Sequence, residues 1–112
     1  MINWSYIKNN DTNVVVFSLN LNFKFNKIAA FDLDHTIIKP KNGIFPKNRY
    51  DWIYVNNIRS KLLELNEKKY NIVIFSNQKA FNKNSDIILT RINEFIDDIN
   101  IDISIFLLIG DD

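Results

Sequence analysis

Cysteine is absent from the sequence, so neither disulfide bonds nor thiolate metal sites can form. No apolar stretch approaches the roughly 18 residues that a membrane-spanning helix needs. The N-terminus, Met1-Ile2-Asn3-Trp4, lacks the basic segment and apolar core of a secretory signal. These absences favour an intracellular protein of the cytoplasm or nucleus, without a membrane anchor.

Glycine and proline are scarce, with two residues of each, and no linker, repeat or low-complexity tract interrupts the chain. The 112 residues are close to the common size of one domain, about 100 to 150 residues. A hydrophobic content of 46% and an aromatic content of 13% are typical of globular proteins. We therefore expect a single domain over residues 1–112.

Two carboxylates, Asp32 and Asp34, stand in the segment 28–38, which is predicted to be an apolar strand followed by a turn. Because side chains alternate along a strand, both can point to one face while Phe31 and Leu33 are buried. Close carboxylates keep their charge most easily beside a cation, and their oxygen atoms suit Mg²⁺. The pair indicates a site where one Asp attacks phosphorus and the other transfers a proton. The alternative is an Asp-rich turn without chemistry.

A second predicted strand, Tyr70–Phe75, is followed at once by Ser76, Asn77 and Gln78. Open α/β sheets bind ligands at the carboxyl ends of their strands, so this hydroxyl and these amides should lie near the two carboxylates. Such groups donate to phosphate oxygens without adding charge. Taken alone, the segment is equally compatible with a polar loop that caps the next helix.

Two helices are predicted from apolar residues that recur every three or four positions. The first has Val55, Ile58, Leu62 and Leu65. The second has Ile88, Ile92, Phe95, Ile96 and Ile99, with Ser85 or Asp86 as its N-cap. A third strand is predicted over Ile103–Ile109. This alternation of strands and helices is typical of an α/β fold with a parallel sheet.

The motifs DLDHT at 32–36 and FSNQ at 75–78 resemble motifs I and II of the haloacid dehalogenase (HAD) superfamily of phosphohydrolases. The pairs Phe45-Pro46 and Asp51-Trp52 narrow this resemblance to the polynucleotide 3′-phosphatase branch, which includes the phosphatase part of polynucleotide kinase/phosphatase enzymes. Upstream, Trp4 and the segment 14–17 are similar to the family's opening β-hairpin, expected within residues 1–26 and leading into the motif I strand. The resemblance implies a HAD-like (Rossmann-like) parallel sheet with flanking helices.

The resemblance also implies roles for individual residues. Asp32 matches the nucleophile, which also binds Mg²⁺, and Asp34 matches the general acid/base, which we place at the metal as well. Four further residues match positions around the phosphate: Thr36, Ser76, Asn77 and Gln78. The implied reaction is Mg²⁺-dependent removal of the 3′-phosphate from DNA ends in DNA repair, through an aspartyl-phosphate intermediate.

The sequence departs from the family in several places. His35 stands where Gly is usual, and the Gly-containing stretch after motif II is replaced. The superfamily also has a lysine (motif III) and an acidic pair (motif IV) beyond a third strand, whereas this sequence ends at Gly110-Asp111-Asp112. That tripeptide is an alternative motif IV, with Lys79 or Lys83 replacing the lysine. We expect the C-terminal part of the domain to be missing, which would leave the motif I strand with an unpaired edge and the chain marginally stable.

Positive charge is concentrated in the first half of the chain. Residues 1–50 hold seven Lys and Arg against three Asp, while residues 51–112 hold seven against ten acidic residues. The basic residues that follow the predicted catalytic turn are Lys39, Lys41, Lys47 and Arg49. They would attract a polyanion, and the aromatic residues among them could stack on an exposed terminal base: Phe45, Tyr50 and Trp52. The alternative is a solvated loop whose aromatic residues, Trp52 above all, belong to the core.

Two other functions stay open. Histidinol-phosphate phosphatases resemble the strand ending in Asn-Gln, and polymerase-tail phosphatases resemble DLDHT, so a different HAD phosphatase is one alternative. A non-catalytic module that binds nucleic acid or another partner is the other. The sequence does not indicate whether a kinase domain accompanies this one.

Overall fold

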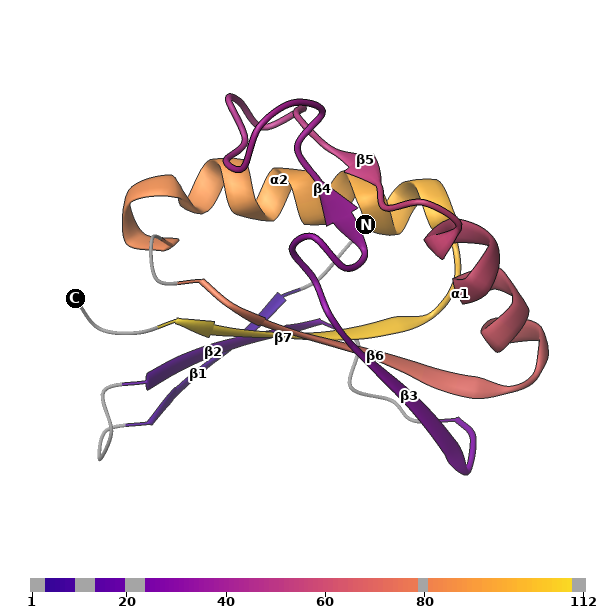
Figure 1. The fold of residues 1–112 in the computed structure, drawn as a ribbon. Coiled ribbons are helices and arrows are strands. Elements are labelled where there is room, and N and C mark those ends of the chain that lie inside the picture. The colour runs from indigo at the N-terminus through magenta and orange to yellow at the C-terminus, as the bar shows by residue number, and fades with distance from the viewer. Residues whose placement is uncertain (1–3, 10–13, 20–23, 79–80, 110–112) are drawn as a thin grey trace.

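The computed structural model of the chain describes residues 4–9, 14–19, 24–78 and 81–109 (Figure 1). In chain order its elements are β1 (Trp4–Asn9), β2 (Val14–Leu19), β3 (Lys27–Asp32), β4 (Ile38–Lys39), β5 (Ile53–Tyr54), α1 (Ile58–Glu67), β6 (Tyr70–Asn77), α2 (Phe81–Ile99) and β7 (Ile103–Ile109). The long strands form one sheet in the order β1-β2-β7-β6-β3, and β4 pairs with β5. The two strands predicted to carry the site, β3 and β6, are therefore neighbours.

Strands β3, β6 and β7 run parallel to one another, because α1 and α2 return the chain to the edge where each strand begins. The predicted α/β class with a parallel sheet is confirmed, and the arrangement is compatible with a Rossmann-like fold. In this register Asp32 lies opposite Phe75, and Asn77 lies opposite Leu108. The carboxyl ends of the three strands thus meet at one edge of the sheet.

The two outer edges of the sheet differ. Strands β1 and β2 form the predicted antiparallel pair, and β2 extends the sheet by pairing antiparallel with β7. At the other edge β3 has β6 as its partner and, within the described residues, no neighbour on its outer side. The hairpin therefore lies too far away to protect the edge of β3, where Ile28 is 59% exposed.

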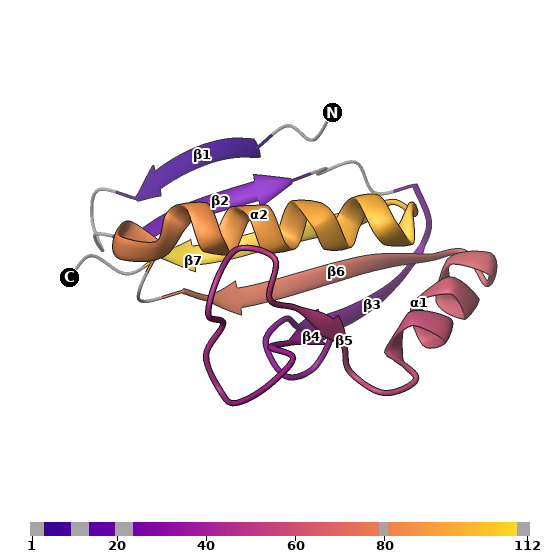
Figure 2. The same cartoon turned by 90° about the horizontal axis from the view of Figure 1, so that it is seen from above.

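Both helices cover the same face of the sheet (Figures 1 and 2). Helix α2 crosses the middle of the sheet, whereas α1 lies near the start of β6. Alternate residues of β6 and β7 point toward these helices, as the period of a strand requires. The fully buried side chains of this layer include Leu62, Ile72, Ile74, Ile92, Phe95, Ile105 and Leu107. Because these residues come from both helices and both inner strands, they form one core.

The opposite face of the sheet carries no helix of the described chain (Figure 1). Here the rings of Phe75 and Phe106 stack with their centroids 5.3 Å apart and their planes 15° apart. Phe75 is 52% exposed and Leu108 is 43% exposed. A group of exposed apolar side chains on one sheet face is unusual for an isolated domain and favours association.

Of the two helices, only α2 begins differently from the sequence-based expectation. Helix α1 starts after Asn57, whose φ of 66° is left-handed and whose side chain makes no capping hydrogen bond. Helix α2 starts at Phe81, so the prediction of Ser85 or Asp86 as its N-cap is wrong. Its backbone is non-helical at Asn84, however, and the regular part begins one residue later. The apolar period revealed this regular part, while the preceding turn carries no such signal.

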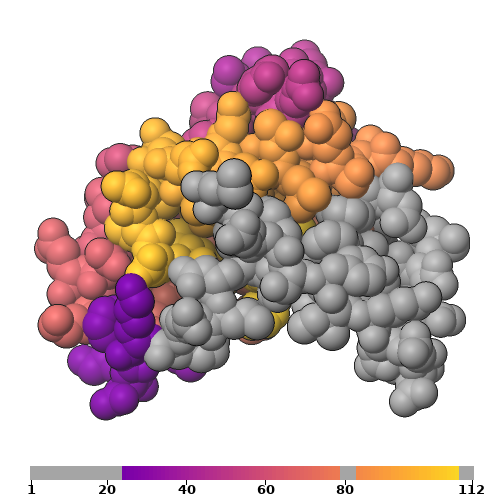
Figure 3. Space-filling model, turned by 180° about the vertical axis from the view of Figure 1, so that it is seen from behind, coloured from indigo at the N-terminus to yellow at the C-terminus, as the bar shows by residue number. Residues whose placement is uncertain are grey.

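The segment between β3 and α1 contains structure that the sequence did not predict. The two-residue strands β4 and β5 pair antiparallel, and the N–H of Val55 donates to the carbonyl of Ile37 at 3.0 Å. These contacts bring the two ends of the segment together, so the loop between β4 and β5 projects beyond α2 (Figure 3). Three of the basic residues predicted to bind nucleic acid, Lys41, Lys47 and Arg49, thus lie on a projecting loop, and Lys39 lies in β4 at its base.

Adjacent residues of β6 provide a test of this one-sided packing. We expect Ile74→Ala, on the fully buried face, to lower the free energy of unfolding by about 2–5 kcal/mol. Phe75→Ala, on the open face, should cost about 1 kcal/mol, because it loses the stacked pair and little buried area. Urea denaturation followed by circular dichroism measures both. Equal losses at the two positions would mean that another element covers the open face.

Candidate active site

A tight turn after β3 sets the positions of the two carboxylates. The carbonyl of Leu33 accepts hydrogen bonds from the N–H groups of Thr36, Ile37 and Ile38 at 3.3, 2.9 and 3.2 Å. His35 has a φ of 61°, a left-handed conformation that most residues other than Gly adopt at a cost. The strand therefore ends at Asp32, and the regular alternation of side chains does not continue to Asp34.

As a result, Asp32 and Asp34 line two different cavities at the carboxyl edge of the sheet. Asp32 belongs to the open face and lines a cavity of about 280 Å³ together with Phe75 and Phe106. Asp34 lines a cavity of about 680 Å³ that extends to the projecting loop and α2. Asn77, which is exposed, lines both cavities. The two carboxylates are thus close in sequence but face two adjoining cavities, and Asn77 lies between the two cavities.

The polar residues after β6 bond directly to Asp34. The side-chain amide of Gln78 donates to Oδ2 of Asp34 at 2.7 Å and to the hydroxyl oxygen of Ser76 at 2.6 Å. The main-chain N–H of Gln78 donates to the carbonyl of Leu108 at 2.9 Å, which fixes its position against β7. The structure therefore brings the two sequence motifs into contact through hydrogen bonds, as well as through strand pairing.

An arginine that the sequence analysis did not single out completes this group. Arg91, on α2, is 4% exposed, and its Nη1 lies 3.7 Å from Oδ1 of Asp34. Its Nε donates to the main-chain carbonyl of Asp51 at 3.0 Å. Burial lowers the pKa of Arg91, and the charge of Asp34 opposes this effect. The sequence does contain an indication that Arg91 is buried, because this charged residue stands within the apolar stripe of Ile88, Ile92 and Phe95.

Asp51 and Trp52 explain why the projecting loop has one conformation. The carboxylate of Asp51 accepts hydrogen bonds from the main-chain N–H groups of Lys41 and Lys47, both at 2.9 Å. These two bonds hold the pKa of Asp51 below its ordinary value. The Trp52 indole N–H donates to Glu94 at 2.9 Å, and its ring packs edge-on against Phe95. The interpretation of Trp52 as a core residue is therefore confirmed.

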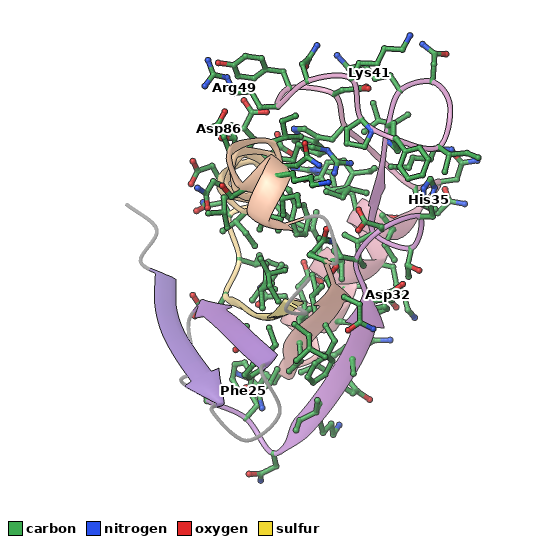
Figure 4. All side chains as sticks on the ribbon, turned by 90° about the vertical axis from the view of Figure 1, so that its left-hand side faces the viewer. Phe25, Asp32, His35, Lys41, Arg49 and Asp86 are labelled. Carbon is green, nitrogen blue, oxygen red and sulfur yellow. The ribbon has the colours of Figure 1, made fainter. Side chains whose placement is uncertain are left out.

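Two labelled side chains of the loop, Lys41 and Arg49, project from the molecule (Figure 4). Lys41, Lys47 and Arg49 are exposed, whereas Lys39 is half-buried in β4. Arg49 makes an exposed ion pair with Asp86 at 3.3 Å, a contact that salt screens readily. Two aromatic side chains of the loop are also exposed, Phe45 at 80% and Tyr50 at 55%, and Phe45 lines the cavity.

The turn and the loop also touch one another. His35 lines the larger cavity, and its Nε2 lies 3.1 Å from the carbonyl oxygen of Ile44. This contact gives the unusual residue at this position a local role in holding the loop beside the turn. Thr36 is half-buried and lines neither of the two cavities.

Carboxylates are the candidates for a metal site. Within the described residues no group of three or more His, Cys, Asp or Glu side chains is placed to hold a metal ion. Mg²⁺ does not need such a group, because it usually takes one or two carboxylates and keeps several waters. The hard oxygens of Asp32 and Asp34 therefore fit Mg²⁺ by their chemistry. Lys83 is exposed on α2, while Lys79 and the tripeptide 110–112 lie outside the described residues.

Comparison with known proteins agrees with the sequence motifs. The family model described as polynucleotide kinase 3 phosphatase matches residues 27–112. A bifunctional polynucleotide phosphatase/kinase of Schizosaccharomyces pombe is 44% identical over 59 residues, which are 51% of this chain and 14% of the relative. A polynucleotide 3′-phosphatase of Saccharomyces cerevisiae is 45% identical over 60 residues, 46% of this chain and 25% of the relative.

A third relative covers more of the chain. A polynucleotide 3′-phosphatase of Arabidopsis thaliana is 32% identical over 91 residues, which are 75% of this chain and 13% of the relative. The chain thus spans about a quarter or less of the length of these three relatives. Among the described helices, none is long and apolar enough to cross a membrane.

The two hydrogen bonds to Asp51 predict a pH dependence. We expect Asp51→Asn to destabilise the protein, because an amide has one oxygen to accept the bonds that two carboxylate oxygens accept. Since the pKa of Asp51 is depressed in the folded state, the stabilisation is complete above the ordinary value of 3.8. It is lost as the pH falls through the depressed pKa. Urea denaturation of both proteins at a series of pH values measures the difference.

Limited proteolysis supplies the control for this prediction. The loop of Asp51→Asn should be cleaved faster than that of the wild type at neutral pH. Asp97→Asn, which removes the same charge from an exposed position on α2, should leave the cleavage rate unchanged. A stability difference that persists unchanged in strong acid would show that the carboxylate charge is not involved.

Proposed function

Since the chain belongs to the polynucleotide kinase 3 phosphatase family, we propose that it hydrolyses the 3′-phosphate at DNA ends, with Asp32 as the nucleophile. The observation that carries this proposal is the set of polar groups at one edge of the sheet. Asp34 is hydrogen-bonded there to Gln78, Gln78 to Ser76, and Asp32 lies at the end of the neighbouring strand. A role in DNA repair, in the cytoplasm or nucleus, is part of the same proposal.

The reaction follows in two steps. A carboxylate oxygen of Asp32 attacks phosphorus and the bond from phosphorus to the 3′ oxygen breaks, while Asp34, which enters this step as the protonated acid, gives its proton to that oxygen. Water then attacks the aspartyl-phosphate, Asp34 takes up its proton, and the bond from phosphorus to the Asp32 oxygen breaks. Inorganic phosphate is released and both carboxylates regain their starting states. The hydrogen bond from Gln78 keeps Asp34 in place for both transfers.

Residues around the two carboxylates would bind the phosphate. Mg²⁺, held by Asp32 and Asp34, would supply the positive charge that offsets the repulsion between two carboxylates and a phosphate. Asn77 is exposed between the cavities and can donate to a phosphate oxygen directly. Ser76 and Gln78 are already hydrogen-bonded to each other, so either would bind the phosphate by exchanging that hydrogen bond for one to a phosphate oxygen. Thr36, which lines neither cavity, would contribute by holding the turn through the bond from its main-chain N–H to the Leu33 carbonyl.

The projecting loop supports a nucleic acid as the substrate. Its exposed cations, Lys41, Lys47 and Arg49, belong to the same loop whose residues Ile44, Phe45 and Pro46 line the larger cavity, and Lys39 stands at the base of the loop. They would bind DNA phosphates and release counterions. The exposed rings of Phe45 and Tyr50 offer faces for a terminal base. A small phosphorylated metabolite would need none of these side chains.

A non-catalytic DNA-binding module is the second candidate function. The observation that favours it is the small number of candidate metal ligands. Among the described residues, no third carboxylate or imidazole joins Asp32 and Asp34 to form a metal-binding group. Such a module would keep the basic loop and the cavity and bind DNA ends without cleaving them. The two candidates differ in whether phosphate is released.

Phosphate release from a 3′-phosphorylated oligonucleotide tests the catalytic proposal. We expect release with Mg²⁺, and a loss of about 10³-fold or more in Asp32→Asn, because the amide is no nucleophile. Asp97→Asn, at an exposed position of α2, is the control and should keep full activity. Activity that survives in Asp32→Asn would exclude the proposed nucleophile. Binding without release in the wild type would favour the module, and release from histidinol phosphate or a phosphopeptide instead would indicate a different phosphatase.

The contribution of the loop can be measured through salt. Binding of a single-stranded oligonucleotide should weaken steeply between about 50 and 200 mM salt. In Lys41→Ala/Lys47→Ala, the slope of log affinity against log salt should fall by about 1–2, because two phosphate contacts are lost. Lys61→Ala/Lys68→Ala, which removes the same charge beside Glu64 on α1, is the matched control. A flat salt response in the wild type would argue against a nucleic-acid substrate.

A further inference from the structure

Arg91 differs from every other basic residue that the structure describes, because its side chain is buried. It is 4% exposed, whereas Lys24, Arg49, Arg59, Lys61 and Lys68 all lie in exposed ion pairs. It occupies the core-facing side of α2, between Ile88 and Phe95. A buried guanidinium is costly to desolvate, so its presence needs a partner or a function.

Contacts within the protein use only part of its hydrogen-bonding capacity. Nε donates to the carbonyl of Asp51 at 3.0 Å, and Nη1 lies 3.7 Å from Oδ1 of Asp34. Nη2 is buried and has no hydrogen-bond partner among the described residues. An unpaired buried donor costs about 1–3 kcal/mol, and more when the group is charged. The guanidinium is therefore held in position by two groups and retains one nitrogen without an acceptor.

The position of this nitrogen is informative because Arg91 lines the cavity of about 680 Å³ that also contains Asp34, His35 and Gln78. A phosphate entering this cavity would face the negative charge of Asp34. Among the described residues, Arg91 is the buried cation that lines this cavity, and its planar guanidinium can donate two hydrogen bonds to phosphate oxygens. Nη2 is itself buried, so a phosphate oxygen would reach it only with a change of the last side-chain torsions of Arg91.

We propose that Arg91 binds the substrate's terminal phosphate through Nη2, in a position fixed by the Asp51 carbonyl and the Asp34 carboxylate. This inference rests on the proposed function for the identity of the substrate, a 3′-phosphorylated DNA end. It goes beyond that function by assigning the phosphate contact to a residue of α2, outside both sequence motifs. The same contacts couple the projecting loop to the site. The carboxylate of Asp51 accepts hydrogen bonds from the main chain of the loop, and the carbonyl of Asp51 accepts one from Arg91.

Two oligonucleotides of one sequence, ending in a 3′-phosphate or a 3′-hydroxyl, test this assignment. Their affinities are measured by fluorescence anisotropy in EDTA, so that no phosphate is released. The wild type should bind the phosphorylated end about tenfold more tightly. In Arg91→Met this ratio should fall to about one, and Arg91→Lys should keep part of it, because lysine retains the charge without the planar donors. Arg59→Gln, at an exposed arginine paired with Asp98, should keep the wild-type ratio.

Thermal melting separates this role from a purely structural one. A methionine fits the apolar stripe of α2 and removes the unpaired donor, but it also leaves the Asp51 carbonyl without its donor and Asp34 without its cation. Arg91→Met should therefore fold, with a melting temperature moderately below that of the wild type. A residue that only braced the loop would give a lower melting temperature with an unchanged affinity ratio. That result, or a ratio of one in the wild type, would overturn the assignment.

The outcome is independent of the phosphatase assay. If the ratio is lost in Arg91→Met although the wild type releases no phosphate, the binding role stands and the proposed catalytic function fails. If the wild type releases phosphate and Arg91→Met keeps both its ratio and its rate, the function stands and the role of Arg91 fails.

Discussion

The parallel pairing of β3 with β6, in the register that sets Asp32 opposite Phe75, is the constraint on which the site depends. It brings the end of β3 beside Ser76 and Asn77, and it places Gln78 within 2.7 Å of Asp34. A slip of β3 by one residue against β6 would move Asp32 to the covered face, away from Phe75. The buried side chains of Ile72 and Ile74 therefore fix the register, and through it the arrangement of the polar groups.

A second set of contacts connects the loop, the turn and α2. The carboxylate of Asp51 binds the main chain of the loop, and the carbonyl of Asp51 binds Arg91. Arg91 in turn forms an ion pair with Asp34. Trp52 secures the same segment to α2 by its bond to Glu94. These contacts attach the loop that carries the exposed cations to α2. Binding of a polyanion there would not need to order the whole loop first.

The sheet is covered on one face, and this affects both stability and the site. Asp32 emerges on the open face beside Phe75 and Phe106, whereas Asp34 lies on the face that the loop and α2 cover. Water therefore reaches the two carboxylates from different sides. The exposed edge at Ile28 and the exposed ring of Phe75 are apolar surfaces that an interacting molecule would bury with a gain in free energy.

The sequence by itself determined the α/β class, the alternation of strands and helices, the hairpin and the proximity of DLDHT to FSNQ. These follow from local periods of apolar residues and from the general geometry of parallel sheets. Only the tertiary structure decided that Asp32 and Asp34 face different cavities, that β4 pairs with β5, and that Arg91 joins the site. Arg91 meets Asp34 across 57 positions of the chain, and Asp51 across 40. Contacts of that kind depend on how the elements pack, and a local pattern does not record them.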